Sequence, residues 1–137
     1  MNIELAVLAD YAAVTHDNKL VIAGIFDSLN VPGLPWSLPM MSLALRISGD
    51  AADAGRHELE LRLVDPDGGA IIPSLKGEFV LPPVPADGAP SSAQLVMGMA
   101  NVVFSAHGPH AFDVLVDGRY ELSVTAYVRP ATVLPAE

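Results

Sequence analysis

Apolar and polar residues alternate with a period of two along several stretches of this chain. In residues 56–64, three leucines are separated by charged residues, so apolar and charged side chains point to opposite faces of an extended backbone. The same period occurs in residues 41–48 and 120–128, and helical spacing is absent from all three stretches. This pattern predicts half-buried β-strands.

Residues that favour tight turns lie between the alternating stretches, in segments 17–18, 66–69 and 117–118. Together these signals predict eight strands, near residues 3–15, 19–27, 40–48, 56–65, 70–80, 94–106, 111–116 and 119–129. Short strands with regular turns and no convincing helix predict a single antiparallel β-sandwich domain over residues 1–137. A small β-barrel is the alternative.

Two proline-rich segments, residues 31–39 and 81–90, interrupt this series of strands. Proline lacks the backbone donor that a central strand needs, so both segments are expected to be surface connections. The second segment could serve as a polyproline ligand for a partner, but we interpret it as an ordinary crossover.

The predicted first hairpin, residues 3–27, carries apolar side chains on both of its faces. An antiparallel sandwich normally leaves one face wet, so a second apolar face must be covered by the same chain or by another subunit. We expect a homo-oligomer, with interface residues Leu8, Ala12, Val14, Val21 and Ile25. The alternative is that the proline-rich loops fold over this face.

Composition narrows the classes of partner. The chain is 51% hydrophobic and 17% charged and has a net charge of −9, which favours a folded domain and disfavours nucleic acid and anionic membrane surfaces as partners. It contains no cysteine, no basic segment of the signal-peptide type and no apolar run long enough to span a bilayer. We therefore expect a cytoplasmic protein.

Motifs that would carry chemistry are weak. His107 and His110 flank a Gly-Pro turn, where they could hold a metal or supply a base, but a typical site needs a third ligand. Residues 65–69 begin like a calcium loop and lack its closing glutamate. The Gly-x-Ser-x-Gly, P-loop and dinucleotide-binding motifs are missing. We expect no catalytic residues, no cofactor and no metal.

Two residues support alternatives. Trp36, the one tryptophan, lies in a proline-bracketed loop that could stack on a ligand or a sugar, although we favour a loop anchor packed on the sandwich. His57 shares the face of the leucines in residues 56–64 and is expected at the rim of the sheet. A cleft that brings His57 or His107 within reach of Asp or Glu would favour an enzyme.

The segments Ala9-Asp10-Tyr11-Ala12 and Gly24-Ile25-Phe26-Asp27, with a turn at Asp17-Asn18 between them, resemble the N-terminal signature of a bacterial protein family of unknown function. The resemblance implies a small bacterial β-domain and no particular activity. Together these observations favour a non-catalytic protein-interaction or assembly module that associates with itself. A ligand-binding or carbohydrate-binding module is the second hypothesis, and an enzyme with a site formed by distant residues is the third.

Overall fold

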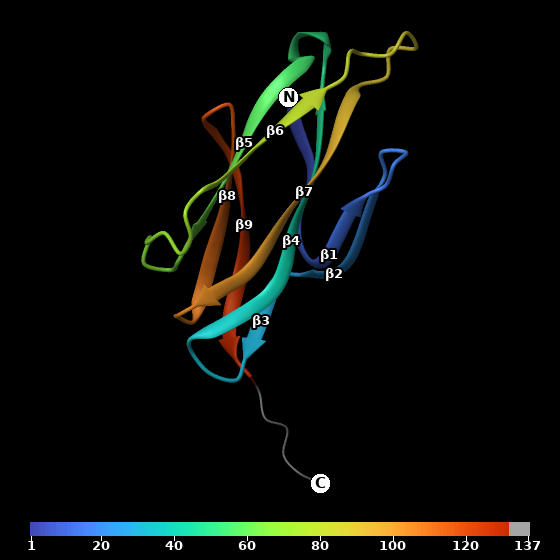
Figure 1. Ribbon diagram of the computed structural model, residues 1–137. Helices are drawn as coiled ribbons and strands as arrows, with labels where there is room; N and C mark the ends of the chain where they lie inside the picture. Colours follow the sequence, from blue (N-terminus) through green and yellow to red (C-terminus); the bar gives the residue numbers. More distant parts are fainter. Residues whose placement is uncertain (132–137) are drawn as a thin grey trace.

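The computed structural model describes residues 1–131 and contains nine strands and one short 3₁₀ turn (Figure 1). The elements are β1 (Asn2–Val14), β2 (Leu20–Phe26), β3 (Ser28–Val31), β4 (Trp36–Gly49), η1 (Ala51–Asp53), β5 (Gly55–Val64), β6 (Leu75–Leu81), β7 (Ser91–Phe104), β8 (Gly108–Val116) and β9 (Arg119–Pro130). Helical structure in residues 1–131 is limited to η1, which is far too short to cross a bilayer.

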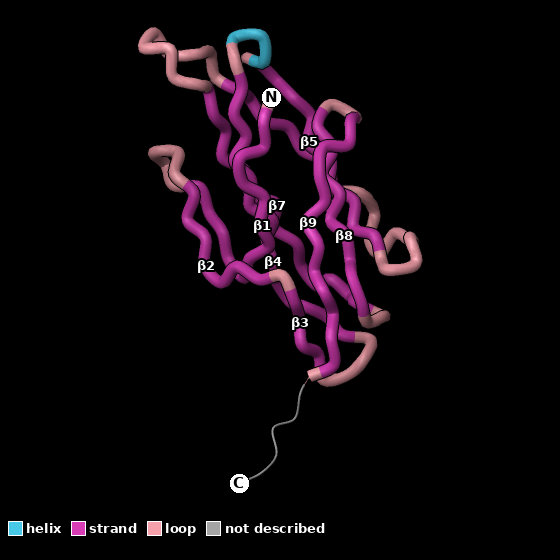
Figure 2. The backbone as a smooth tube through the Cα atoms, turned by 180° about the vertical axis from the view of Figure 1, so that it is seen from behind, coloured by secondary structure: helices cyan, strands magenta, loops and turns pink. Residues whose placement is uncertain are grey.

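The strands form two sheets that face each other (Figures 1 and 2). One sheet has the order β2-β1-β4-β7 and the other has the order β3-β9-β8-β5-β6. All pairings are antiparallel except that of β3 with β9. The prediction of an antiparallel β-sandwich is confirmed.

Alternate residues of the strands fill the space between the sheets. In β5, Leu59, Leu61 and Leu63 are buried while Glu58 and Arg62 are exposed, as the period of two predicts. Glu60 departs from this pattern, because it is buried and its carboxylate lies 3.3 Å from Arg62 Nη2. The largest fully buried apolar side chains are contributed by both sheets, and they are Phe104, Phe112, Leu8, Met41, Leu43, Leu45, Ile47, Leu61, Leu63, Leu81 and Val31.

The proline-rich segment at residues 31–39 differs from the prediction, because it ends in a strand. β4 begins at Trp36 and includes Pro39, although it lies between β1 and β7 in the sheet. β1 pairs with β4 only as far as Ser42. At Pro39, β4 therefore has β7 as its single neighbour, and no backbone N–H is needed there for a hydrogen bond to β1. The short strand β3 was also not predicted, since only its pairing with β9 defines it.

The first hairpin bends back on the sheet to which it belongs. β1 pairs with β4 in its first half and with β2 in its second half, and it also contacts β7 although β4 lies between them. Ala9, Ser42 and Ala44 are buried although they do not belong to the core between the sheets. The figures show the hairpin returning beside β7 (Figures 1 and 2). The hairpin itself therefore covers part of the outer face of the four-stranded sheet.

Candidate functional site

The hairpin of β1 and β2 is closed by a five-residue turn. Thr15 N donates to Lys19 O at 2.9 Å, and Asn18 N donates to Thr15 O at 3.0 Å. Asn18 has a φ of 63°, a left-handed conformation that asparagine tolerates. The predicted turn at residues 17–18 is thus confirmed, and it sets the register of the two strands.

One face of this hairpin is apolar and largely open to solvent. Directly paired residues of antiparallel strands share a face, and the pairs Ala9 with Ile25, Tyr11 with Ala23 and Ala13 with Val21 place six uncharged residues together. We call Ala9, Tyr11, Ala13, Val21, Ala23 and Ile25 the hairpin face; Ala9, at its end, is buried, and the other five residues are exposed or partly exposed. Ile25 is 62% exposed, Tyr11 54% and Val21 47%.

The structure separates the five residues predicted to form an interface. Val21 and Ile25 lie on the hairpin face, and Val14 is exposed beside the turn. Leu8 is fully buried in the core and Ala12 is nearly buried, so neither can belong to an exposed surface of the protomer. For these two residues the prediction is corrected. Leu8 and Ala12 lie on an apolar face of the hairpin that other residues of the same chain cover.

Tyr11 belongs to the hairpin face but was not among the predicted interface residues. The signal for it was present in the sequence. Tyr11 is two residues from both Ala9 and Ala13, so all three side chains lie on the same face of the strand. Its partner on the other strand, Ala23, is also uncharged.

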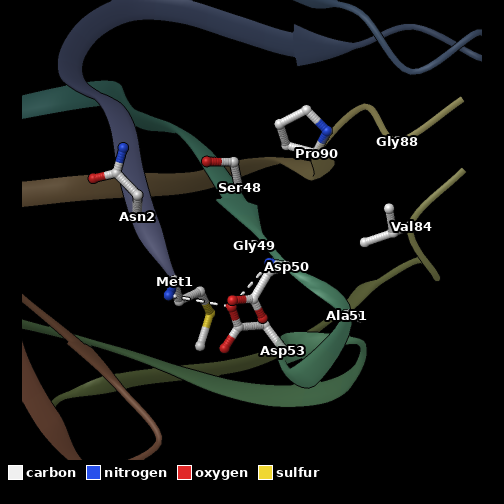
Figure 3. Close-up of a pocket in the computed structure, with 10 residues that line it drawn as sticks. All are labelled: Met1, Asn2, Ser48, Gly49, Asp50, Ala51, Asp53, Val84, Gly88 and Pro90. Atoms are coloured by element: carbon white, nitrogen blue, oxygen red, sulfur yellow. Dashed lines mark hydrogen bonds and ion pairs between the residues drawn. The ribbon is translucent and has the colours of Figure 1, made fainter.

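A pocket of about 420 Å³ lies at one end of the sandwich, between the N-terminus, the segment from the end of β4 to η1, and the connection from β6 to β7 (Figure 3). It is lined by Met1, Asn2, Ser48, Gly49, Asp50, Ala51, Asp53, Val84, Gly88 and Pro90. Figure 3 shows the Asp53 carboxylate reaching toward the backbone of Asp50 and the amino group of Met1. The pocket therefore has two carboxylates and an apolar wall.

Both carboxylates of this pocket are engaged by the chain. Asp53 Oδ2 accepts from Asp50 N at 3.0 Å and lies 3.2 Å from the Met1 ammonium nitrogen. Asp50 Oδ1 accepts from Ala52 N at 2.9 Å and completes a capping box at η1. The backbone hydrogen bond from Asp50, then the hydrogen bond from Met1, lower the pKa of Asp53. These carboxylates stabilise the turn and are poorly placed to act as a base.

His57 lies beside this pocket and is held at both ring nitrogens. Its Nδ1 is 2.7 Å from Asp117 Oδ2, and its Nε2 is 2.6 Å from the backbone carbonyl oxygen of Asp53. A carbonyl and an ionised carboxylate only accept hydrogen bonds, so both contacts are hydrogen bonds at once only in the imidazolium form of the ring. The hydrogen bond to Asp117, then that to Asp53, raise the pKa of His57. The ring also stacks on Phe79, with centroids 5.3 Å apart.

This His–Asp contact is the juxtaposition that would favour an enzyme, but its geometry serves another purpose. The side chain of His57 is 14% exposed, and neither nitrogen has a lone pair directed at solvent. Asp117 Oδ1 also accepts from Glu58 N at 2.9 Å, and the hydrogen bond from His57 lowers the pKa of Asp117. The imidazolium therefore ties η1 and the turn between β8 and β9 to β5.

The other predicted histidine pair is divided between surface and core. His107 is exposed, whereas His110 lies in β8 with 0% exposure. His110 Nδ1 is 3.0 Å from Gly108 O, its ring meets Phe104 edge-on, and its Nε2 has no hydrogen-bond partner. The two imidazoles do not share a surface. Within residues 1–131 no group of three or more potential metal-binding side chains occurs.

The remaining candidates have structural roles. Trp36 is the first residue of β4, pairs with Phe104 and packs against the core, so it is an anchor and does not sit in an open loop. Asp65 Oδ1 accepts from Asp67 N at 2.9 Å and from Gly69 N at 2.8 Å. Its carboxylate stabilises a turn between β5 and β6, as expected for a hairpin connection.

Comparisons with known proteins give a family and a distant structural likeness. Residues 4–129 match the profile described as "Family of unknown function (DUF6941)". No curated protein matches the chain. Among solved structures, the chain is similar to the alkylpurine DNA glycosylase AlkC of Pseudomonas fluorescens bound to DNA containing an abasic site analogue. The TM-score is 0.46 and the identity 15%, over 90% of this chain and 30% of that one. A likeness at this level carries no argument about function.

Proposed function

We propose that this chain, which belongs to the family of unknown function DUF6941, is a non-catalytic protein-interaction module that assembles with copies of itself. The observation that carries the proposal is the hairpin face. It brings Tyr11, Val21 and Ile25 together on an exposed surface that has no charged residue. Contiguous apolar surface of this kind marks sites of protein association more often than scattered single residues do.

The distribution of charge supports self-association through this face. The protein has a net charge of −9, so two copies repel each other wherever their acidic surfaces meet. The charged residues nearest the turn, Asp17 and Lys19, form an ion pair at 3.2 Å outside the face. The six residues of the face bring no like charges together, and the exposed carboxylate of Asp27, which lines a hollow with Ile25, lies at the end of the face. The gain comes from removing apolar side chains from water.

The state of the titratable groups supports a non-catalytic role. Both nitrogens of His57 are occupied by Asp117 and Asp53, and the pocket carboxylates hold backbone donors and the amino group of Met1. General base catalysis needs a side chain within hydrogen-bond reach of a substrate proton. In this protein these groups instead form hydrogen bonds and an ion pair within the chain.

Light scattering coupled to size-exclusion chromatography, over a range of protein concentrations, tests this function. We expect the wild type to be larger than a monomer and Ile25→Glu to weaken the association while the β-sheet circular dichroism is retained. Tyr120→Glu is the matched control, because Tyr120 is 61% exposed on β9 of the other sheet. A wild type that is monomeric at tens of micromolar, or an equal effect of both substitutions, would contradict the proposal.

A further inference from the structure

We infer that two copies of this chain pack their hairpin faces together in antiparallel directions, about a two-fold axis at Ala23, so that Lys19 of each copy lies against Asp27 of the other. The inference rests on the proposed function. It adds how the two faces are arranged, and it names two charged residues that select this arrangement.

A charged residue stands beyond each end of the hairpin face. Lys19 directly precedes β2, and Asp27 directly follows it. Thr15 N donates to Lys19 O at 2.9 Å, so the pairing of the two strands extends to Lys19, which shares the face of Val21 two residues later. Asp27 lines a hollow of about 300 Å³ together with Ile25. The exposed uncharged surface therefore lies between a cation and an anion.

These two charges differ in the partners that they already have. Asp27 is exposed and forms no ion pair within residues 1–131. The Lys19 side chain is 75% exposed, and its Nζ lies 3.2 Å from Asp17 Oδ2. The other oxygen of Asp17 accepts a hydrogen bond from Thr15 Oγ. An ammonium group has three donors, so Lys19 can keep its contact with Asp17 and bind a second carboxylate.

The order of the charges selects one orientation of the two copies. If the two hairpins ran in the same direction, each Asp27 would face the Asp27 of the other copy, and like charges that face each other weaken association. In antiparallel directions, each cation faces an anion. Ala23 lies four residues from both Lys19 and Asp27, so an axis at Ala23 forms both contacts at once.

A second copy is the occupant because the face is complementary to itself. An isologous contact uses the same patch twice, so each residue must fit the residue that the two-fold axis places opposite it. About Ala23, the axis places Ile25 opposite Val21, so apolar side chains also meet apolar side chains. Packed sheets keep their strand directions within about 30° of each other. The flexible stem of Lys19 spans the offset that this angle leaves.

Reversal of the two charges tests the pairing. Lys19→Glu and Asp27→Lys should each raise the Kd of the assembly about tenfold, because each places like charges at two symmetric contacts. The double variant Lys19→Glu/Asp27→Lys should return the Kd close to its wild-type value. Sedimentation velocity gives the Kd, and circular dichroism checks that each variant keeps its β-sheet spectrum.

Two control variants make the same changes in net charge elsewhere on the surface. Lys76→Glu lies on β6, and Asp67→Lys lies in the turn between β5 and β6, and both wild-type residues are exposed. Neither site belongs to the hairpin, so both variants should keep the Kd within about twofold of the wild-type value.

A spin label measures the orientation directly, because the chain has no cysteine and one introduced thiol is unique. His16 lies exposed in the turn between β1 and β2 and does not belong to the hairpin face. In antiparallel copies the two turns lie at opposite ends of the contact. Labels at His16→Cys should therefore be about 30–40 Å apart by pulsed electron paramagnetic resonance, since a strand advances about 3.4 Å per residue. A distance below about 20 Å would place the hairpins in the same direction and overturn the inference.

The outcomes separate this arrangement from the proposed function. If Ile25→Glu weakens the assembly and the double charge variant stays as weak as the single ones, the arrangement fails and self-association through the hairpin face stands. The arrangement also fails if the two control variants change the Kd as much as the hairpin variants do. If the wild type is monomeric at tens of micromolar, the proposed function fails, and the inference fails with it.

Discussion

The side chain of Asp10 lies directly over Gly24 on the neighbouring strand of the first hairpin. Gly24 has a φ of +72°, and a Cβ added there would lie 2.9 Å from Asp10 Cγ and clash with its carboxylate. Asp10 and Gly24 belong to the two segments that carry the resemblance to the family, Ala9–Ala12 and Gly24–Asp27. The contact gives a physical reason for finding both segments in one hairpin, where the chain bends back on the sheet.

Gly24→Ala is expected to destabilise the fold, because it adds a clash to a backbone conformation that L-residues avoid. We expect a loss on the order of 1–3 kcal/mol in the free energy of unfolding, measured by urea denaturation. Asp10→Ala in the same background should recover only the part due to the clash. Gly77→Ala is the control, since a Cβ there meets nothing within 4 Å and its φ is not left-handed. Equal losses at both glycines would contradict this account.

The contribution of His57 to stability should depend on pH. The pKa of His57 is raised above 6.5 by its hydrogen bonds to Asp117 and the Asp53 carbonyl, so this contribution is complete below pH 6.5 and is lost as pH rises through the raised value. The pKa of Asp117 is lowered below 3.8 by the hydrogen bond from His57, so its share is lost as pH falls through that lower value. The pair is therefore most effective between pH 3.8 and 6.5.

His57→Gln measures this dependence. Losing the charge-assisted hydrogen bonds should cost about 1–3 kcal/mol at pH 6, and the difference from wild type should shrink toward pH 9. Urea denaturation from pH 5 to pH 9 gives the free energies, and nuclear magnetic resonance titration of the imidazole gives its pKa. A constant difference across this range would show that the ring acts by packing on Phe79 alone.

Leu8 and Ile25 should respond in opposite ways to substitution. Leu8 is fully buried in the core, so Leu8→Ala should cost about 2–5 kcal/mol, and Leu8→Glu should prevent folding. Ile25 is 62% exposed, so in the dissociated protomer Ile25→Ala should change the free energy of unfolding by no more than about 0.5 kcal/mol. Chemical denaturation at low protein concentration separates the protomer from its assembly. Similar costs at both sites would place Ile25 in the core.

His110 should be replaceable, because its Nε2 is buried without a partner. His110→Leu removes an unpaired polar atom and one hydrogen bond, and these effects largely offset each other. We expect a change of less than about 1.5 kcal/mol in the free energy of unfolding. Phe104→Ala, at the aromatic ring that His110 contacts, should cost about 3–5 kcal/mol. A large loss for His110→Leu would reveal a buried partner for Nε2.

Much of the fold follows from short-range features of the sequence. The alternation in residues 56–64 and the turns at residues 17–18 and 117–118 predict strands and hairpins, because side-chain period and left-handed backbone are local properties. The sandwich follows from these strands, since each must bury one face. Alternation along one strand does not show which other strand pairs with it. For this reason β3 was not predicted, and β4 was predicted to begin later than it does.

The sequence by itself determined an acidic chain of alternating strands without a recognisable catalytic motif, and it placed apolar residues on both faces of the first hairpin. The tertiary structure decided which of those faces is open. Leu8 and Ile25 are equally apolar in the sequence, but the hairpin register pairs Leu8 with Phe26 and Ala9 with Ile25, which places Leu8 on the core face and Ile25 on the opposite, solvent-exposed face. It also decided that His57 meets Asp117, 60 residues away, because such contacts depend on how strands are ordered in a sheet and on no local pattern.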